Sequence, residues 1–425
     1  MHNDNNVRLR EKGLCGIVPK YEHAPVTLSG TPLAAFRIVY PAAKRAFEKW
    51  IAEGLAELLR DFAEVTVSTT TDATPADGTP EILVGATNRK AEPLAAGIHA
   101  CDRGVVLAGK TPYELGLARR ALMRLVDASV IRGDGRVELP AFTPLPARPE
   151  TSVMSYNLYG FHAYQSRIDN ICRIITKYLP DVISIQEPDL EMMALTHVNL
   201  DAYYSYYNGR PRHGEANDLP DAKGANSVAP ILYNRERFRL LTGDTKWMSD
   251  TPDVPSKYAS STYYRHYTYA VLEDRESGAR FVAVNLHLQR AVALEQTKIV
   301  FDELAWLFPK LPILLVGDFN SEADKPVLGF LREVAGFASA HDTARRIRDG
   351  HNRIDWILYS RDMAEATFYH CCTETYPDPD DKKGYYDGKT PSDHFAFYAE
   401  LVIRPGVAPG RDWSAVRSFV PPTQE

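Results

Sequence analysis

Short apolar runs alternate along the chain with longer stretches in which apolar residues recur every three or four positions. Runs of the first kind have the length of β-strands, and stretches of the second kind are typical of amphipathic helices. In the N-terminal third, the predicted strands are residues 36–40, 81–85 and 104–108. Residues 43–62 carry the helical spacing between the first two strands. This alternation predicts a small α/β domain.

A second helix of this domain is predicted from its first residues. Thr111 and Glu114 have the spacing of a capping box, and Pro112 suits the first position of a helix. We expect this helix to continue to about residue 126.

A proline-rich stretch predicts the domain boundary. Its prolines are Pro140, Pro144, Pro146 and Pro149. A stretch of this kind is extended and cannot pair as a central strand. We therefore predict a small, non-catalytic α/β domain over residues 1–148 and a catalytic domain over residues 149–425.

The larger domain repeats the alternation on a larger scale. The predicted strands are residues 153–157, 181–187, 229–233, 267–272, 282–287 and 313–318. Helical spacing is found over residues 168–178 and 294–308. This pattern predicts layered α/β packing, with reactive residues at strand ends and in loops.

Several apolar runs end in a residue that binds metal ions or phosphate groups. These residues are Asn157, Gln186, Glu187, His287, Asp318, Asn320 and Asp355, followed near the C-terminus by Ser392, Asp393 and His394. Because strand side chains alternate between two faces, Asn285 and His287 should project on one side. Asp318 and Asn320 should do the same, so that each pair can meet a single ligand.

Two carboxylates, a carboxamide and an Asp–His pair on separate strands are what metal-dependent phosphate hydrolysis requires. Magnesium is held by one or two carboxylates, several waters and the substrate's own phosphate oxygens. Zinc is less favoured, because no cluster of histidines and cysteines has its ligand spacing. A histidine beside a carboxylate can accept a proton, because the carboxylate stabilises the imidazolium that results. We predict a Mg²⁺ site, with Mn²⁺ as a substitute.

Each of these residues also has a structural explanation when it is taken alone. Asn157 after a strand can form a turn, and His287 can be a hydrogen-bonded structural histidine. Asp318 and Asn320 could cap a following helix. Their joint occurrence at the ends of apolar runs favours a functional site.

In this order, the motifs resemble the endonuclease/exonuclease/phosphatase superfamily over nearly the whole larger domain. Residues 247–252, with the pattern Trp-x-Ser-x-Thr-Pro, and Arg265 resemble one of its subfamilies. The resemblance implies a four-layer α/β sandwich, in which two mixed β-sheets lie face to face with helices outside. It also implies a magnesium-dependent phosphoric ester hydrolase that uses in-line attack by an activated water.

The resemblance implies ligands for the metal and the phosphate. Glu187 would be the principal metal ligand, with Asn157 and Asp393 near the metal or the phosphate. His287 and Arg265 would contact the scissile phosphate or its leaving oxygen.

The resemblance also implies residues that handle the attacking water. Asp318 and Asn320 would activate or orient this water, and Asn320 would also contact the phosphate. His394, supported by Asp355, would be the general base or a donor that stabilises the phosphate. Whether His394 or Asp318 takes the proton stays open at this point.

Composition and charge narrow the function only slightly. With 425 residues, of which 44% are apolar, the chain can bury two cores. A net charge of -6 gives no general attraction to nucleic acid or anionic membranes. The 5 cysteines are scattered and odd in number, which predicts reduced, mostly buried thiols. The N-terminus is polar and no membrane-spanning run is present, so we expect a cytoplasmic protein, although a leader removed beforehand would leave the same sequence.

The first domain carries no constellation of chemical residues. Residues 81–89 and 102–104 resemble the non-catalytic N-terminal α/β domain of some carbohydrate-active enzymes. A stabilising or partner-docking role is the main expectation, and carbohydrate binding is the alternative.

The substrate is the least determined feature. Residues 203–213 are rich in tyrosine and arginine and could line the active-site cleft, where they would stack on bases or sugars, or form a structural edge strand. Nucleic acid, phospholipid or inositol-phosphate head groups and small phosphodiesters are all candidate substrates, with a phosphomonoester as a further option. The alternative class is a non-catalytic glycan- or partner-binding protein on the same scaffold.

Overall fold

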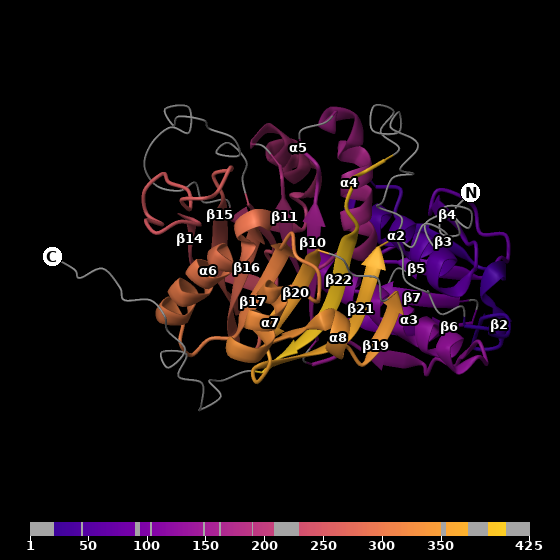
Figure 1. The fold of residues 1–425 in the computed structure, drawn as a ribbon. Coiled ribbons are helices and arrows are strands. Elements are labelled where there is room, and N and C mark those ends of the chain that lie inside the picture. Colours follow the sequence, from indigo (N-terminus) through magenta and orange to yellow (C-terminus); the bar gives the residue numbers. More distant parts are fainter. Residues whose placement is uncertain are drawn as a thin grey trace.

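The computed structural model describes residues 21–43, 46–89, 94–102, 104–147, 149–160, 163–188, 190–207, 229–349, 354–372 and 390–404. Their strands form four sheets, and the longer helices lie between or outside the three large ones (Figure 1).

The first large sheet belongs to the N-terminal region. In spatial order its strands are β4 (Ser68–Thr71), β3 (Arg37–Tyr40), β5 (Glu81–Val84), β7 (Gly104–Ala108), β6 (Gly97–Cys101) and β9 (Phe142–Pro144). A small sheet beside it contains β2 (Thr31–Pro32), β1 (Thr27–Leu28) and β8 (Arg136–Val137). The three strands predicted for this region are confirmed as β3, β5 and β7.

Two helices, α2 (Ala46–Ala63) and α3 (Pro112–Arg132), cover one face of this sheet. The predicted start of α3 is confirmed, because the Glu114 amide donates to the Thr111 side chain at 3.2 Å. In a capping box the Glu114 carboxylate would accept from the amide of Thr111, the cap residue. In this structure it accepts instead from the Lys110 amide at 2.5 Å. The helix also continues past residue 126 and ends where Gly133 adopts φ 82°, a left-handed conformation that glycine adopts without strain.

The larger domain contains two mixed sheets. The seven-stranded sheet has the order β12 (Tyr204–Tyr207), β13 (Ile231–Asn234), β11 (Val182–Gln186), β10 (Thr151–Asn157), β22 (Ala396–Ile403), β21 (Ala364–Cys372) and β19 (Arg346–Asp349). The six-stranded sheet has the order β14 (Phe238–Trp247), β15 (His266–Asp274), β16 (Arg280–His287), β17 (Ile313–Asp318), β20 (Asp355–Ser360) and β18 (Phe337–Ser339). Both sheets combine parallel and antiparallel pairs.

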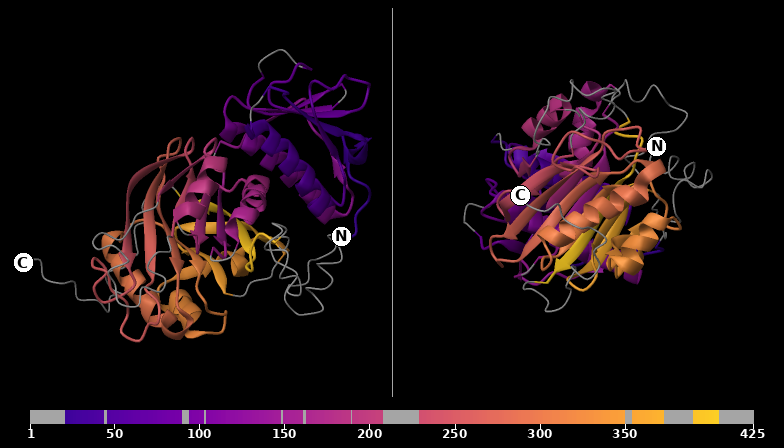
Figure 2. Two further views of the ribbon diagram at one scale, coloured as in Figure 1. Left: turned by 90° about the horizontal axis from the view of Figure 1, so that it is seen from above. Right: turned by 60° about the vertical axis from the view of Figure 1, so that its left-hand side comes forward.

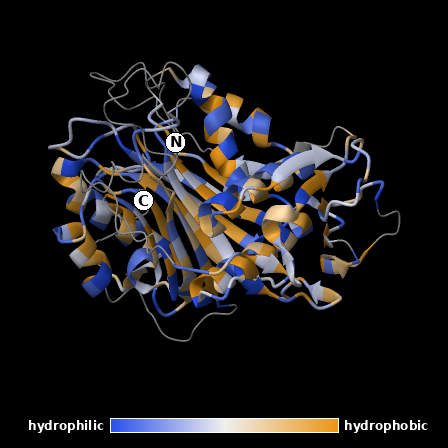
Figure 3. Cartoon of the chain, turned by 90° about the vertical axis from the view of Figure 1, so that its right-hand side faces the viewer, coloured by the Kyte–Doolittle hydropathy of each residue, from blue (hydrophilic) through white to orange (hydrophobic). Residues whose placement is uncertain are grey.

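The two sheets pack face to face through a core that includes Val153, Leu314, Ile357 and Phe397. Strands β10, β11 and β17 are buried on both faces, which explains why the sequence shows continuous apolar runs there. Figure 3 shows these hydrophobic residues, in orange, along the central strands.

Helices cover the outer faces of both sheets, which confirms the predicted α/β sandwich. α6 (Ala293–Leu307) and α7 (Pro326–Gly329) lie on the side of the six-stranded sheet. The short helix α8 (Ala340–Thr343) contacts strands of both sheets, β20 and β21. α4 (Tyr164–Tyr178) and α5 (Leu190–Leu200) lie on the side of the seven-stranded sheet (Figure 1).

The N-terminal helices join this outer layer. Figure 2 shows α2 and α3 between the first sheet and the larger domain. Ile51 of α2, Ile175 of α4 and Tyr398 of β22 belong to one hydrophobic core. Because this core is continuous, the division at residue 148 stays a prediction.

Polar contacts also cross this junction. The Arg119 guanidinium donates to the Thr176 carbonyl at 3.2 Å, and Arg120 pairs with the buried Asp181 at 3.1 Å. Arg237 reaches the same Asp181 oxygen from the larger domain at 2.9 Å. The N-terminal region is therefore anchored by buried charges as well as by apolar packing.

The tyrosine-rich segment forms an edge strand in its described part. β12 lies at the edge of the seven-stranded sheet, which agrees with the predicted alternative of a structural edge strand. Arg210, Arg212 and His213 lie outside the described residues, and a cleft wall formed by this segment stays untested. Cys172, Cys371 and Cys372 are buried, whereas Cys101 is exposed and Cys15 lies outside the described residues. None of the described helices is both long and apolar enough to span a lipid bilayer.

Candidate active site

A row of side chains crosses the six-stranded sheet at one end of its strands. Register pairs Trp247 with His266, His287 with Asp318, and Asp318 with Asp355. The register of β15 and β16, continued by one residue, places His266 opposite His287. Paired residues of neighbouring strands point to the same face, so the row brings three predicted site residues together.

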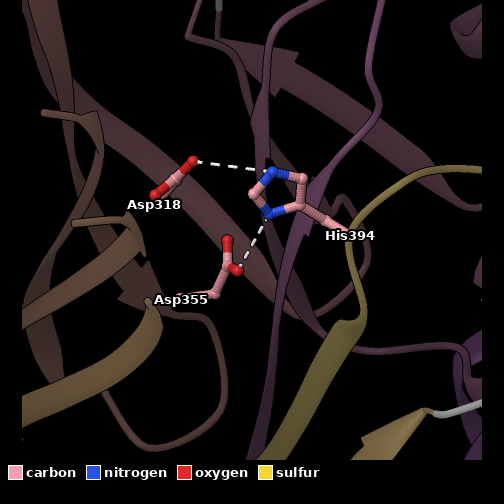
Figure 4. A group of neighbouring side chains, drawn as sticks. All are labelled: Asp318, Asp355 and His394. Carbon is pink, nitrogen blue, oxygen red and sulfur yellow. Dashed lines mark hydrogen bonds and ion pairs between the residues drawn. The ribbon is translucent and has the colours of Figure 1, made fainter. Parts of the chain in front are cut away.

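Asp318, Asp355 and His394 form the centre of the site (Figure 4). The Nδ1–H of His394 donates to Asp355 Oδ2 at 3.0 Å, and its Nε2 lies 3.9 Å from Asp318 Oδ2. One potential ligand atom of each residue lies within 4.8 Å of the others. The chain therefore concentrates two buried carboxylates and an imidazole at one point.

The turn that carries His394 is anchored to the seven-stranded sheet, at the end of β10. The Ser392 hydroxyl donates to the Asn157 carbonyl at 2.5 Å, and the His394 amide donates to the Ser392 oxygen at 3.1 Å. Asp393, between them, has a carboxylate oxygen 4.0 Å from His394 Nε2. The Ser-Asp-His string thus combines one anchoring residue with two residues that face the site.

Asn157 links the ends of the two sheets. Its Nδ2 donates to Asp318 Oδ2 at 3.2 Å, and its Oδ1 accepts from the Tyr159 amide at 3.0 Å. Its side chain also interacts with the Glu187 carboxylate and opposes the rise that burial causes in the pKa of that group. Glu187 adopts φ 62°, which is a strained conformation for a residue with a side chain. The backbone at Glu187 is approached closely by Gly160, where any Cβ would collide with the Glu187 carbonyl.

His287 lies between these carboxylates and Arg265. Its Nε2 is 3.4 Å from Asp318 Oδ2 and 3.9 Å from Glu187 Oε1. The two terminal nitrogens of Arg265 lie 3.1 and 3.2 Å from the two ring nitrogens of His287. Burial, and then the charge of Arg265, hold the pKa of His287 well below its usual range.

Asn285 does not share a ligand with His287, and this part of the prediction is wrong. Its Oδ1 accepts from Gln186 Nε2 at 2.7 Å, and its Nδ2 donates to the carbonyls of Ile185 and Pro230 at 2.6 and 2.8 Å. These bonds tie the two sheets together beneath the site. Asn285 and Gln186 are therefore structural, because buried amides need all of these partners.

Asn320 shapes the loop after β17. Its amide donates to Asp318 Oδ1 at 2.8 Å, and its Nδ2 donates to the Leu288 carbonyl at 2.9 Å. Asn320 adopts φ 47°, and the next helix begins only at Pro326. The helix-capping explanation of Asp318 and Asn320 is therefore wrong; the Asp318 side chain instead closes a turn that fixes its own orientation.

Several carboxylates are buried together in the site, and burial disfavours their charged forms. Burial, and then the nearby Asp355 charge, raise the pKa of Asp318 to about 7. Burial also raises the pKa of Glu187 and the pKa of Asp393. Burial alone would lower the pKa of His394, but the Asp355 charge and hydrogen bond raise it to about 10. A bound cation would relieve this repulsion between carboxylates.

Two carboxylate oxygens near this point accept no hydrogen bond from the described residues. Asp355 Oδ1 and Asp393 Oδ1 are buried, and neither has a hydrogen-bond partner in the part of the chain that the structure describes. Buried polar atoms of this kind are usually satisfied by a partner, and hard oxygen donors suit Mg²⁺. The donor set therefore fits a divalent cation.

Every residue predicted for the site lies in this network of contacts, and the roles assigned to them stay predictions. His266, by contrast, was not predicted. Among the described residues, it can be recognised only by its position opposite His287, and this position is known only when β15 and β16 have been paired.

The candidate site lies within the part of the chain that matches one protein family. A model of the Endonuclease/Exonuclease/phosphatase family matches residues 154–394, which is more than half of the chain and includes all the predicted site residues. No curated protein matches the chain significantly.

Solved structures share the fold of the larger domain. An endonuclease/exonuclease/phosphatase from Bacteroides vulgatus is 18% identical with a TM-score of 0.51, over 60% of this chain and 100% of its own. A family protein from Bacteroides thetaiotaomicron is 23% identical with a TM-score of 0.51, over 60% of this chain and 99% of its own. A mannosyl-6-phosphatase from the same species is 23% identical with a TM-score of 0.50, over 59% and 99%. At these identities the likeness concerns the fold alone.

Proposed function

The chain belongs to the endonuclease/exonuclease/phosphatase family, and we propose that it is a divalent-metal-dependent phosphoric ester hydrolase. The observation that carries this proposal is the position of Asp318 Oδ2. This oxygen lies within 4 Å of side-chain nitrogens of Asn157, His287 and His394. These neighbours fix the position of the carboxylate, which can orient a water molecule and receive its proton.

The metal ion belongs on the Glu187 side of the site. We assign Glu187, Asp393 and Asn157 as the residues that would hold Mg²⁺, with Mn²⁺ as a substitute. When bound, the ion supplies positive charge that polarises the phosphate and offsets the charge that develops on it. Asp318, Asp355 and His394 are also close enough together to hold a cation, but His394, whose pKa is raised to about 10, is protonated and has no lone pair for a metal ion. We therefore assign these three to the attacking water and the phosphate.

The proton of the attacking water passes to Asp318. The raised pKa of Asp318, about 7, suits a group that gains and loses a proton near neutral pH. His394 has a pKa raised to about 10 and is held by Asp355, so it acts as a cationic donor to the phosphate. Asn320 fixes the Asp318 carboxylate through its backbone amide and adds a polar contact for the phosphate.

The reaction is an in-line displacement at phosphorus. A bond forms between the water oxygen and phosphorus, and the bond from phosphorus to the leaving oxygen breaks. Arg265 and His287 stabilise the leaving oxygen, which takes its proton from solvent. The products are the alcohol and the new phosphate. The step therefore needs no oxidant, reductant or other co-reactant.

A phosphodiester is the proposed ester class, with a phosphomonoester as the second option. Nucleic acid, lipid or inositol-phosphate head groups and small diesters remain the candidate substrates. The net charge of -6 weighs against tight binding of duplex DNA.

Residues 1–148 are proposed to be non-catalytic. This is supported by the packing of α2 and α3 against the outer side of the seven-stranded sheet, where they form one core with α4. A carbohydrate or protein contact of this region has no support among the described residues.

The test is hydrolysis of a generic aryl phosphodiester and of a panel that contains single-stranded DNA, RNA, sphingomyelin, inositol phosphates and cyclic nucleotides. We expect activity with Mg²⁺ and loss of activity with a chelator. Absence of activity on every substrate, with Mg²⁺ and with Mn²⁺, would favour the alternative of a non-catalytic glycan- or partner-binding protein.

A further inference from the structure

Tyr263 is an exposed aromatic residue beside the site. It lies between β14 and β15 and is 41% exposed, whereas its neighbours Ser261 and Tyr264 are buried. Single exposed aromatic residues are common on protein surfaces, so the case for a function of Tyr263 rests on its contacts with the site.

Buried polar groups fix the backbone of Tyr263. Its amide donates to Gln289 Oε1 at 2.9 Å, and Ser261 Oγ lies 2.7 Å from both that oxygen and the Tyr263 carbonyl. Gln289 is buried, and its own amide donates to Gln296 Oε1 at 2.8 Å. Because Gln289 follows His287 by two residues, this network ties the Tyr263 loop to the strand that carries His287. The backbone that carries the ring is therefore held in place.

The ring also contacts a residue of the site. The Arg265 guanidinium carbon lies 5.3 Å from the centre of the Tyr263 ring, in a cation–π contact. The other side of Arg265 meets His287. Tyr263, Arg265 and His287 thus lead from the exposed surface to the carboxylates of the site.

The proposed function indicates which part of the substrate lies near Tyr263. In an in-line displacement the attacking and leaving oxygens lie on opposite sides of phosphorus. The proposed function places Arg265 and His287 at the leaving oxygen, so the leaving group lies on their side of the phosphate. Tyr263 is an exposed aromatic residue in contact with Arg265 on this side.

We propose that Tyr263 determines substrate specificity by stacking on a ring of the leaving group. This proposal rests on the proposed function and names its substrate class: phosphate esters whose leaving group carries a sugar or nucleobase ring close to the ester oxygen. Such stacking needs no hydrogen bond and therefore no tyrosine hydroxyl.

The test compares wild-type protein with Tyr263→Ala and Tyr263→Phe on matched substrates. Among diesters, a dinucleotide carries rings and glycerophosphocholine does not. Among monoesters, a nucleoside 5′-monophosphate and a hexose 6-phosphate carry rings and glycerol 3-phosphate does not. Phe142→Ala in β9 is the control variant, because Phe142 is exposed to a similar extent, 39%, in the N-terminal sheet. Thermal unfolding checks that each variant is folded.

For Tyr263→Ala we expect KM to rise on the order of tenfold for the ring-bearing substrates, with the acyclic esters unchanged. Tyr263→Phe and Phe142→Ala should keep wild-type KM values. The nucleoside and hexose arms show which ring is preferred. Equal effects of Tyr263→Ala on ring-bearing and acyclic esters, or no effect on either, overturn the proposal while leaving the proposed function in place. If the wild-type protein hydrolyses none of the esters, the proposed function fails, and this proposal fails with it.

Discussion

His394 and Asp355 share a 3.0 Å hydrogen bond although they belong to different sheets. Asp355 begins β20 of the six-stranded sheet, and His394 precedes β22 of the seven-stranded sheet. The site therefore exists only when the two sheets are packed against each other. The same packing is maintained beneath the site by the bond from Gln186 to Asn285.

Asp355→Asn should remove the charge that holds His394 as a cation and leave the fold intact. We expect hydrolysis to fall about 10²- to 10⁴-fold, because the orientation and charge of the imidazole are both lost. Steady-state kinetics measure the loss, and Asp201→Asn, at an exposed turn, is the control. Combining Asp355→Asn with His394→Gln should add little, since the two residues act as a unit. Full additivity of the two losses would contradict the pairing.

Glu187→Gln should weaken metal binding, because the substitution removes the negative charge of the proposed principal ligand. We expect the Mg²⁺ concentration that gives half-maximal activity to rise, and turnover at saturating substrate to fall about 10²-fold or more. A Mg²⁺ titration of the initial rate measures both quantities. Glu191→Gln, exposed on α5, is the matched control. A folded Glu187→Gln protein with wild-type metal dependence and turnover would refute the assignment.

Acid should destabilise the protein in part through His266. Burial, and then the Arg265 charge, lower the pKa of His266 from 6.5 to about 4. Between these values the unfolded chain binds a proton that the folded protein excludes, so this contribution to stability is complete above pH 6.5 and is lost as the pH falls towards 4. At pH 5 the loss corresponds to about 2 kcal/mol of unfolding free energy.

The comparison that isolates this effect uses His266→Phe, which keeps an aromatic ring beside Trp247. Thermal unfolding at pH 7.5 and pH 5 should show a smaller acid-induced fall in Tm for this variant than for the wild type. His197→Phe, at a half-buried position on α5, should retain the wild-type fall. Identical pH dependence of the wild type and His266→Phe would argue against a neutral buried His266.

Gly54→Ala should loosen the junction between the N-terminal region and the larger domain. A Cβ at Gly54 would collide with the Arg119 guanidinium and lie 3.1 Å from the Lys177 Cα atom. α2 and α4 would then have to separate, at a cost of roughly 1–3 kcal/mol. We expect a lower Tm with nearly unchanged specific activity at temperatures where the variant is folded.

Gly329→Ala is the matched control for this substitution. A Cβ at Gly329 meets nothing within 4 Å, and alanine favours a helix, so this variant should be neutral or slightly more stable. A Gly54→Ala protein as stable as Gly329→Ala would show that the two helices are not in the close contact described above.

The sequence by itself determined the kinds of elements and the residues proposed for the site. Continuous apolar runs predicted β10, β11 and β17, because strands buried on both faces have no polar side to present. Thr111, Pro112 and Glu114 located the start of α3, since capping depends on local geometry. Residues such as Asp318 and His394 could be selected because each ends an apolar run and their order resembles one family.

The tertiary structure alone decided which of these residues contact one another. Asn285 has the same strand position as a ligand, but pairing of the sheets brings Gln186 against it and makes it a structural bridge. His266 and Tyr263 join the site only through the register of β15 with β16 and the bonds to Gln289. The joining of α2 and α3 to the larger domain likewise depends on contacts between residues far apart in the chain, such as Arg119 with Thr176. Local patterns cannot encode such contacts, because they form only when distant segments fold against each other.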